Sequence, residues 1–209
     1  MQGSGIEHAE GGGTPAGQNI TGFQIWVNVP SSHKMDTPRY GTEPPENIPV
    51  VHFPDRSFAR LLAGTMASED GEQVTGPFRT VQAVQMVDYN VFAADTVTHT
   101  VPPHLDNVLV YVYGGGGVIN GQTVSPHDCV HLNASEAHKR SITMTGASAG
   151  LAAIIFGGKM LRQPIAWHGP FVMTTQEEIR DTLREYRTGT FLKQRVEWDY
   201  KRIATKPVV

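Results

Sequence analysis

The sequence predicts an all-β domain, a sandwich or a barrel, that ends in a helical tail. Between residues 50 and 158, apolar segments of strand length recur at intervals of about ten residues, a spacing typical of sandwiches and barrels. The 209 residues include 22 glycines and 14 prolines, and many short strands need many turns. A helical pattern is found only near the C-terminus, after residue 174.

The N-terminal part begins with a glycine-rich stretch over residues 1–17, whose composition alone indicates a flexible tail. Phe23–Val29 then alternates, with Phe23, Ile25, Val27 and Val29 on one face, and predicts a strand. Residues 30–49 contain five prolines, which predict that this stretch forms neither a helix nor a central strand. We expect this stretch to connect two structured regions.

The region from residue 50 onward supplies the predicted strands. Val108–Tyr113 is apolar on both faces and therefore predicts a central strand, which Gly114–Gly117 is expected to end. Asn120-Gly121 between two short apolar runs predicts a hairpin turn. The remaining predicted strands are Val50–Phe53, Ser57–Leu62, Arg79–Tyr89, Asp95–Val101, Val130–Leu132, Arg140–Thr145 and Leu151–Phe156.

The helical tail begins with a capping box, with Thr175 at the N-cap and Glu178 three residues later. Ile179, Leu183 and Tyr186 form an apolar stripe at helical spacing. Gly189 suits the residue that follows a helix C-terminus, and a second short helix is predicted over residues 191–201. The mixed charges between Arg180 and Arg187 predict a solvated face.

Composition excludes several classes of protein. Lys and Arg total 17 against 20 Asp and Glu, so the chain has a net charge of −3 and lacks the basic excess of a nucleic-acid-binding domain. A single cysteine, Cys129, excludes an internal disulfide framework and indicates a reducing compartment, so we expect an intracellular protein of the cytoplasm or nucleus. We expect no membrane partner, since no apolar stretch reaches the length of a membrane span.

His8-Ala9-Glu10 is the first candidate for a metal site. If this tripeptide lies in a strand, His8 and Glu10 point to the same side and can bind one cation. An imidazole with a carboxylate suits Fe(II), Mn, Zn, Ni or Cu with little discrimination. As a bare pattern it equally fits an exposed dipeptide in a flexible tail. Cys129 is expected to be a buried small hydrophobic residue rather than a catalytic thiol.

Three stretches of the chain carry distinctive motifs. They are Gly5-Ile6-Glu7-His8-Ala9-Glu10; Gly22-Phe23-Gln24-Ile25-Trp26-Val27-Asn28-Val29-Pro30 with Lys34-Met35 and Pro38-Arg39-Tyr40; and His168-Gly169-Pro170-Phe171-Val172-Met173-Thr174-Thr175 with Glu177-Glu178-Ile179. These stretches resemble motifs of the pirin family, a family of proteins with two cupin barrels. They occur in the family's order and spacing, and the similarity spans the chain, although residues 53–160 are similar mainly in strand pattern.

The resemblance implies a double-stranded β-helix, the cupin fold, with a C-terminal helical tail. Residues 1–49 would then be the end of an N-terminal cupin barrel and a linker, 50–165 a C-terminal cupin barrel, and 166–209 a segment and helix that pack back on the body. His168 is expected at that structural junction. In this arrangement the strand over residues 23–29 would expose an apolar face, and we expect self-association or poor order there.

The resemblance also changes the interpretation of His8 and Glu10. They match two of the four protein ligands of a non-haem iron, Fe(II), in pirins, with Glu10 also a candidate general base. The family supplies the other two ligands from a His-x-His pair upstream of this motif, and the motif here lies at the start of the chain. We therefore expect an N-terminally incomplete metal site, because two ligands alone hold a cation weakly.

The C-terminal barrel is not expected to bind metal. A metal-binding cupin barrel has a His-x-His pair, a glutamate a few residues later and a further histidine. Here His99 and His104 are separated by two prolines, and Asp106 follows without a glutamate. These histidines, together with His127, Asp128 and His131, are expected in loops or at the surface.

The sequence and its resemblance to the pirin family leave three functions open. Some pirins are flavonol 2,3-dioxygenases, which implies a small aromatic substrate such as quercetin, a metal that binds the deprotonated flavonol and O₂, and Glu10 as general base. Other pirins are redox-sensing transcription co-regulators, which implies a transcription-factor partner. The third alternative is a metal-free structural protein.

Overall fold

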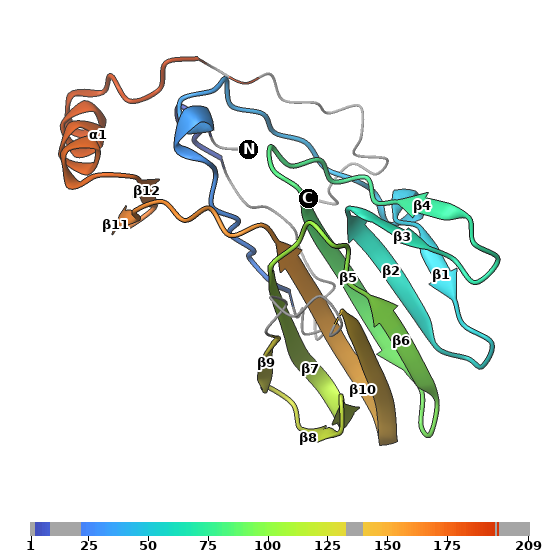
Figure 1. Ribbon diagram of the computed structural model, residues 1–209. Helices are drawn as coiled ribbons and strands as arrows, with labels where there is room; N and C mark the ends of the chain where they lie inside the picture. Colours follow the sequence, from blue (N-terminus) through green and yellow to red (C-terminus); the bar gives the residue numbers. More distant parts are fainter. Residues whose placement is uncertain (1–2, 9–21, 133–139, 195, 197–209) are drawn as a thin grey trace, which may run out of the picture. The chain divides into compact units, whose positions relative to one another are not determined.

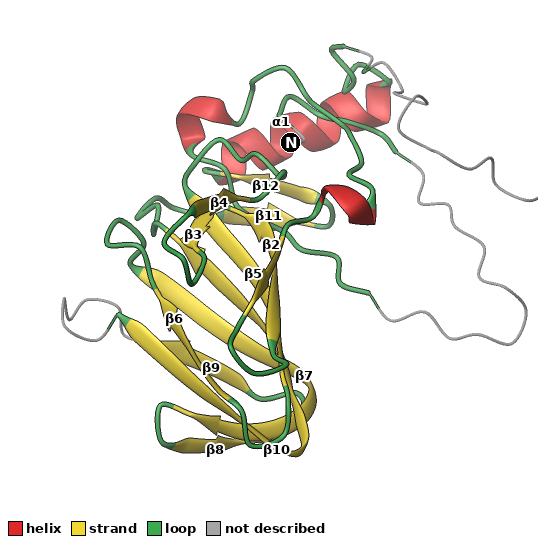
Figure 2. Cartoon of the chain, turned by 90° about the vertical axis from the view of Figure 1, so that its right-hand side faces the viewer, coloured by secondary structure: helices red, strands yellow, loops and turns green. Residues whose placement is uncertain are grey.

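The computed structural model describes residues 3–8, 22–132, 140–194 and 196. The chain divides into two compact units. Residues 43–160 form the first, which we call the barrel unit; residues 1–42 and 161–209 form the second, which we call the terminal unit. Figure 1 labels the elements, and Figure 2 shows that strands dominate the barrel unit, as the composition predicts.

The barrel unit contains an eight-stranded sheet in which β1, β2, β5, β10, β7 and β8 are neighbours in that order. Strand β6 pairs with β10 and β9 pairs with β7, and every pairing between these strands is antiparallel. A separate hairpin, β3 and β4, was not predicted. The strands are β1 (Val50–His52), β2 (Phe58–Ala63), β3 (Thr65–Ala67), β4 (Gln73–Thr75), β5 (Val84–Val91), β6 (Thr96–Thr100), β7 (Asn107–Ile119), β8 (Gln122–Val124), β9 (Cys129–Leu132) and β10 (Ser141–Gly158).

Two strands are longer than predicted because glycines bend them without ending them. β7 continues through Gly114–Gly117, and β10 joins the two predicted strands 140–145 and 151–156 into one. A Cβ atom on Gly115 would lie 2.0 Å from the carbonyl oxygen of Gly150, and one on Gly117 would lie 2.0 Å from that of Thr145. The two backbones therefore approach more closely than any side chain allows, so here glycine marks a close approach and not a turn.

The core of the barrel unit lies on one face of these strands. Along β5, Val87, Tyr89 and Val91 alternate into the core, and Ala153 and Ile155 of β10 lie beside them in the ladder. All of these side chains are at most 2 % exposed. The alternation follows from the two-residue period of a strand, which places every second side chain on the buried face.

The terminal unit is formed by both ends of the chain. It contains a short hairpin of β11 (Ala166–His168) and β12 (Phe171–Met173), and the helix α1 (Gln176–Thr188). The predicted capping box is confirmed: the backbone N–H of Glu178 donates to Thr175, and the Glu178 carboxylate accepts from the N–H of Thr175. Gly189 is left-handed at φ 72° and ends the helix as predicted. Among the described helices, none is long and apolar enough to cross a membrane.

Two predictions in this unit are wrong. Residues 22–30 form no strand, because no neighbouring segment of the described chain provides the hydrogen-bond ladder that defines one. Residues 22–27 are nevertheless all exposed, with Trp26 at 49 %, so the predicted apolar exposure is observed, while self-association stays a prediction. The second helix is also absent from residues 191–194, where Gly189 has reversed the chain; residues 195 and 197–201 lie outside the described part.

The proline-rich connection contains two single-turn 3-10 helices, Ser31–His33 and Pro45–Asn47, where no helix was predicted. Each has a proline at its N-cap, where the missing N–H of proline removes no helical hydrogen bond.

We expect Gly117→Ala to lower the free energy of unfolding by about 1–3 kcal/mol, because the new methyl group meets a backbone carbonyl that cannot rotate away. Chemical denaturation of the full chain measures this loss. Gly158→Ala is the matched control, since a Cβ at that position of β10 meets no atom within 4 Å. Equal denaturation midpoints for the two variants would contradict the close approach of β7 and β10.

Candidate functional site

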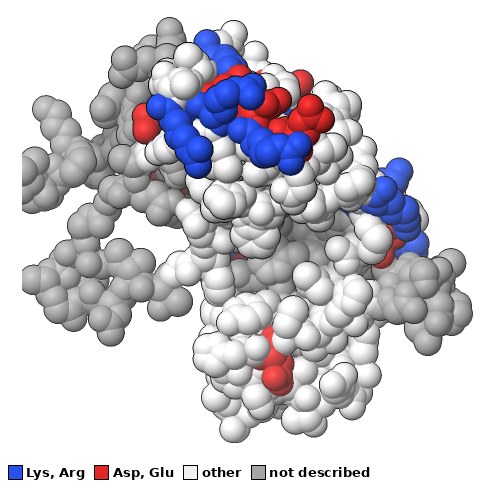
Figure 3. Space-filling model, turned by 90° about the vertical axis from the view of Figure 1, so that its left-hand side faces the viewer, with Lys and Arg blue, Asp and Glu red and all other residues white. Residues whose placement is uncertain are grey.

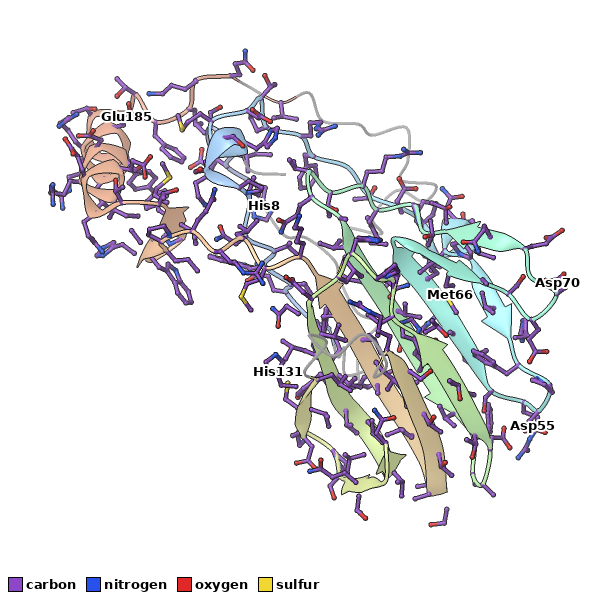
Figure 4. All side chains as sticks on the ribbon, in the orientation of Figure 1. His8, Asp55, Met66, Asp70, His131 and Glu185 are labelled. Atoms are coloured by element: carbon purple, nitrogen blue, oxygen red, sulfur yellow. The ribbon has the colours of Figure 1, made fainter. Side chains whose placement is uncertain are left out.

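The predicted metal ligands lie at the start of the terminal unit. His8 is exposed, in a segment without strand structure, and its ring centroid lies 6.0 Å from that of Tyr40 (Figure 4). Glu10, the second predicted ligand and general base, lies outside the described residues, so the pair is not tested as a pair. An exposed imidazole beside an aromatic ring leaves His8 accessible to a ligand.

The segment that carries His8 is attached to the chain near residue 36. The backbone N–H of Ser4 donates to the carbonyl oxygen of Asp36 at 2.8 Å. A Cβ on Gly3 would lie 2.0 Å from that same oxygen, so only glycine allows the approach. The Asp36 carboxylate in turn accepts a hydrogen bond from His33 Nδ1 at 2.7 Å, which fixes the turn that presents this carbonyl.

Lys34 joins three parts of the terminal unit. Its ammonium group donates to Asn28 Oδ1 at 2.8 Å and to the carbonyl oxygen of Val172 in β12 at 3.1 Å. The side chain is buried, and burial lowers the pKa of Lys34, although the nearby charge of Glu178 opposes the shift. The two acceptors replace the water that the ammonium loses, so Lys34 acts as a structural link.

A chain of hydrogen bonds crosses the core of the barrel unit. The side-chain N–H of Gln85 donates to the carbonyl oxygen of Thr65 at 2.7 Å, so Gln85 Oε1 faces His99 Nε2 at 3.0 Å as an acceptor. His99 therefore carries its proton on Nε2, and Nδ1 accepts from the Tyr89 hydroxyl at 2.8 Å. Every side-chain group in this chain has a partner, as burial requires.

This arrangement corrects the prediction that His99 lies in a loop or at the surface. His99 is in β6 and only 2 % exposed, because the alternation of β6 places Val97 and His99 inward. Burial lowers the pKa of His99 to about 4 and raises that of Tyr89 above its usual range. His99 has no lone pair left for a metal, since one nitrogen donates and the other already accepts.

A second polar group lies on the opposite face of β5, and sequence reasoning missed it. Asp88 pairs with Arg60 of β2, its partner in the strand register, through Arg60 Nε at 2.9 Å and through Nη2. The Tyr113 hydroxyl donates to the other Asp88 oxygen at 2.8 Å. Burial, followed by the bond to Asp88, raises the pKa of Tyr113 to about 12. The sequence did contain a signal for this pair: one predicted strand carries the basic residue Arg60, and another carries the acidic residue Asp88.

The other residues predicted in loops or at the surface are exposed as expected: His104, His127, Asp128 and His131. His104 is in an exposed turn, and His131 is exposed on β9 with its Nε2 3.1 Å from Asn107 Oδ1. His127, at φ 76°, places Nδ1 3.2 Å from the Tyr111 hydroxyl.

Cys129 is exposed, contrary to the expectation of a buried thiol, because it falls on the outward side of β9. His168 is exposed in β11.

The charges of α1 form a mixed surface. Figure 3 shows basic and acidic side chains interspersed on the face that carries this helix. Arg184 pairs with Asp181 at 2.8 Å, one turn away. The helix therefore presents charges of both signs in nearly equal number, in agreement with the prediction of a solvated face.

The described residues contain no group of three or more His, Cys, Asp or Glu side chains that could hold a metal ion. His8 is the one predicted ligand whose position is known, and the buried histidine of the barrel unit is fully hydrogen-bonded. Of the predicted ligand pair, the described part of the chain thus provides His8 alone, and it does not by itself fit a metal.

Comparison with known proteins gives consistent matches. The Pirin C-terminal cupin domain matches residues 86–192. A Vibrio cholerae protein provisionally named a quercetin 2,3-dioxygenase is 32% identical over 190 residues, which are 90% of this chain and 64% of the relative. A Caulobacter vibrioides pirin-like protein is 28% identical over 190 residues, again 90% of this chain and 65% of the relative. The chain therefore spans less than two thirds of the length of these relatives.

A solved structure supports the fold. The crystal structure of an Acinetobacter baumannii protein named quercetin 2,3-dioxygenase matches with a TM-score of 0.71 at 26% identity, over 79% of this chain and 55% of the other. Together with the domain match, this confirms the predicted fold class, a mostly β cupin fold with one C-terminal helix.

We expect the barrel unit to lose stability as the pH falls from about 6.5 to about 4, by on the order of 3 kcal/mol. Between these two pH values His99 is protonated in the unfolded chain but not in the folded chain, so protonation favours the unfolded state. The stability that neutral His99 contributes to the fold is therefore complete above this pH range and absent below it. Urea denaturation at a series of pH values measures the change.

His99→Gln is the control for this pH dependence, because it keeps a polar side chain but cannot titrate. The difference between wild type and variant should shrink as the pH falls through the window. A constant difference from pH 7 to pH 4 would show that another group is responsible.

Proposed function

Since this chain belongs to the pirin family, we propose that it takes part in metal-dependent oxygenation of a flavonol such as quercetin, as a 2,3-dioxygenase-type oxidoreductase. We further propose that His8 and Glu10 are metal ligands, that the metal is Fe(II), and that Glu10 is the general base. The substrate would be a small aromatic molecule.

One observation carries this proposal: His8 is exposed on a segment whose sequence, Gly5-Ile6-Glu7-His8-Ala9-Glu10, matches the family's ligand motif. The names of the Vibrio cholerae and Acinetobacter baumannii relatives support the choice of reaction. Fe(II) fits an imidazole and carboxylate donor pair, although this donor set also suits other divalent metals.

The proposal requires ligands beyond those that the structure describes. His8 and Glu10 leave a cation coordinated mainly by water, and the described residues supply no further set. Under this proposal, Glu10 has two tasks: one carboxylate oxygen holds the ion, and the carboxylate accepts the proton of the flavonol hydroxyl.

For the barrel unit itself we propose a structural role. A specific observation favours it: the core is filled by side chains at most a few per cent exposed, and the polar chain through His99 is complete. The redox-sensing co-regulator remains the alternative for the protein as a whole, and a metal-free protein is the alternative if no ion is retained.

We expect His8→Ala and Glu10→Ala each to lower the iron content and the rate of quercetin oxygenation by at least about 100-fold, because each removes a direct ligand. Elemental analysis and O₂ consumption with quercetin measure the two quantities on the same purified samples. His104→Ala, which changes an exposed histidine in the barrel unit, should leave both unchanged.

Two outcomes count against the proposal. Turnover that survives both ligand substitutions shows that the site is assigned to the wrong residues. A chain that retains no iron and does not oxygenate quercetin overturns the dioxygenase proposal for this chain and supports the metal-free alternative.

A further inference from the structure

Three aromatic side chains of the terminal unit form a compact cluster. Phe171 of β12 meets Tyr186 of α1 at a centroid distance of 5.7 Å and Phe191 at 5.2 Å. Tyr186 and Phe191 are 5.9 Å apart. All three pairs meet edge to face, the arrangement that the ring quadrupoles favour. We call Phe171, Tyr186 and Phe191 the aromatic cluster.

The end of α1 determines where Phe191 lies. Gly189 adopts a left-handed conformation, and the N–H of Thr190 bonds back to the carbonyl oxygen of Glu185 at 2.9 Å, so the chain reverses over the last turn. Lys193 then pairs with the Glu185 carboxylate at 2.7 Å; Figure 4 labels Glu185 on α1. These contacts hold the residues on both sides of Phe191 against the helix.

The Phe191 ring packs directly on the N-terminal segment. Gly5 is buried, and a Cβ on this residue would lie 2.7 Å from Cζ of Phe191 and within 3.2 Å of two further ring atoms. The backbone of Gly5 thus lies on the ring with no space between them. Gly5 has φ +119°, a conformation that other residues rarely adopt, so both the packing and the backbone require glycine here.

This contact is the second attachment of the segment that carries His8. The first is the bond from Ser4 to Asp36, which lies on the N-terminal side of Gly5. The contact with Phe191 is therefore the nearer of the two to His8, three residues further along, whose ring lies beside Tyr40. Of these two attachments, release of Gly5 would leave the bond at Ser4, which is the more distant from His8 in the sequence.

We propose that Phe191 is a positioning residue for His8: the aromatic cluster clamps Gly5 and so fixes the place of the imidazole. A residue of the C-terminal part, Phe191, thereby fixes the position of the candidate metal ligand of the N-terminal part, His8. The part of this inference that concerns metal binding rests on the proposed function, whereas the clamp itself rests on the contacts above.

The test is Phe191→Ala in the full chain, with NMR of the His8 ring protons and titration with Co²⁺ as readouts. In wild type the Tyr40 ring should displace the His8 resonances from the values of an unstructured peptide. In Phe191→Ala we expect these resonances to move to the unstructured values, and the Kd for Co²⁺ to rise about tenfold. Phe191→Tyr keeps the ring and should restore both.

Two further variants keep the test interpretable. Leu192→Ala removes a neighbouring side chain that is 47 % exposed, and it should leave the His8 resonances unchanged. Gly5→Ala disturbs the same contact from the other side and keeps all three aromatic side chains, so it should release His8 while α1 stays folded by circular dichroism.

The outcomes are separable. Unchanged His8 resonances in both Phe191→Ala and Gly5→Ala overturn the positioning role. Released resonances with an unchanged Kd for Co²⁺ overturn its relevance to metal binding. If wild type binds no Co²⁺, the proposed metal site fails, and the clamp is decided by the His8 resonances alone.

Discussion

The close approach of β7 and β10 is the constraint on which the barrel unit depends. β10 pairs with β5, β6 and β7, so it is the strand through which most of the sheet is connected. It reaches all three because it runs for 18 residues and bends between them. That bend brings backbone against backbone at Gly115 and Gly117, where any side chain would collide with a carbonyl group. Without glycine at these points, β10 would be interrupted between the part that pairs with β6 and the part that pairs with β5, and β7 could not pair with both parts.

The strand β5 shows how the barrel unit accommodates polar groups without a ligand. Its inward face carries Tyr89, which bonds His99, and its outward face carries Asp88, which bonds Arg60 and Tyr113. In both groups each buried polar atom has a protein partner, so neither is a vacant site. A buried histidine in a cupin fold could be mistaken for a metal ligand. Here both ring nitrogens of His99 have protein partners, so His99 belongs to the core and the candidate metal ligand is His8.

The family motifs lie in the terminal unit, and they contact one another there. Lys34 of the second motif bonds Asn28 within that motif and Val172 of the third. Gly5 of the first motif packs on Phe191, which packs on Phe171 of the third. Stretches more than a hundred residues apart in the sequence thus form one structure that holds the N-terminal segment. These short motifs are therefore joined by close contacts, while the family domain match over residues 86–192 covers much of the barrel unit as well.

How much the sequence could predict depends on whether the signal was local. The capping box at Thr175 and Glu178, the left-handed Gly189 and the Asn120-Gly121 hairpin were predicted correctly, because each is determined within a few residues. The continuity of β10, the burial of His99 and the missing ladder at residues 22–30 were predicted wrongly, because each depends on a partner distant in the sequence. The candidate site falls between these cases. Its ligand motif is local and could be recognised, but the contact between Gly5 and Phe191, which determines where His8 lies, joins the two ends of the chain. In the sequence Gly5 is one of several glycines within residues 1–17, so no local signal distinguishes it as the point of contact.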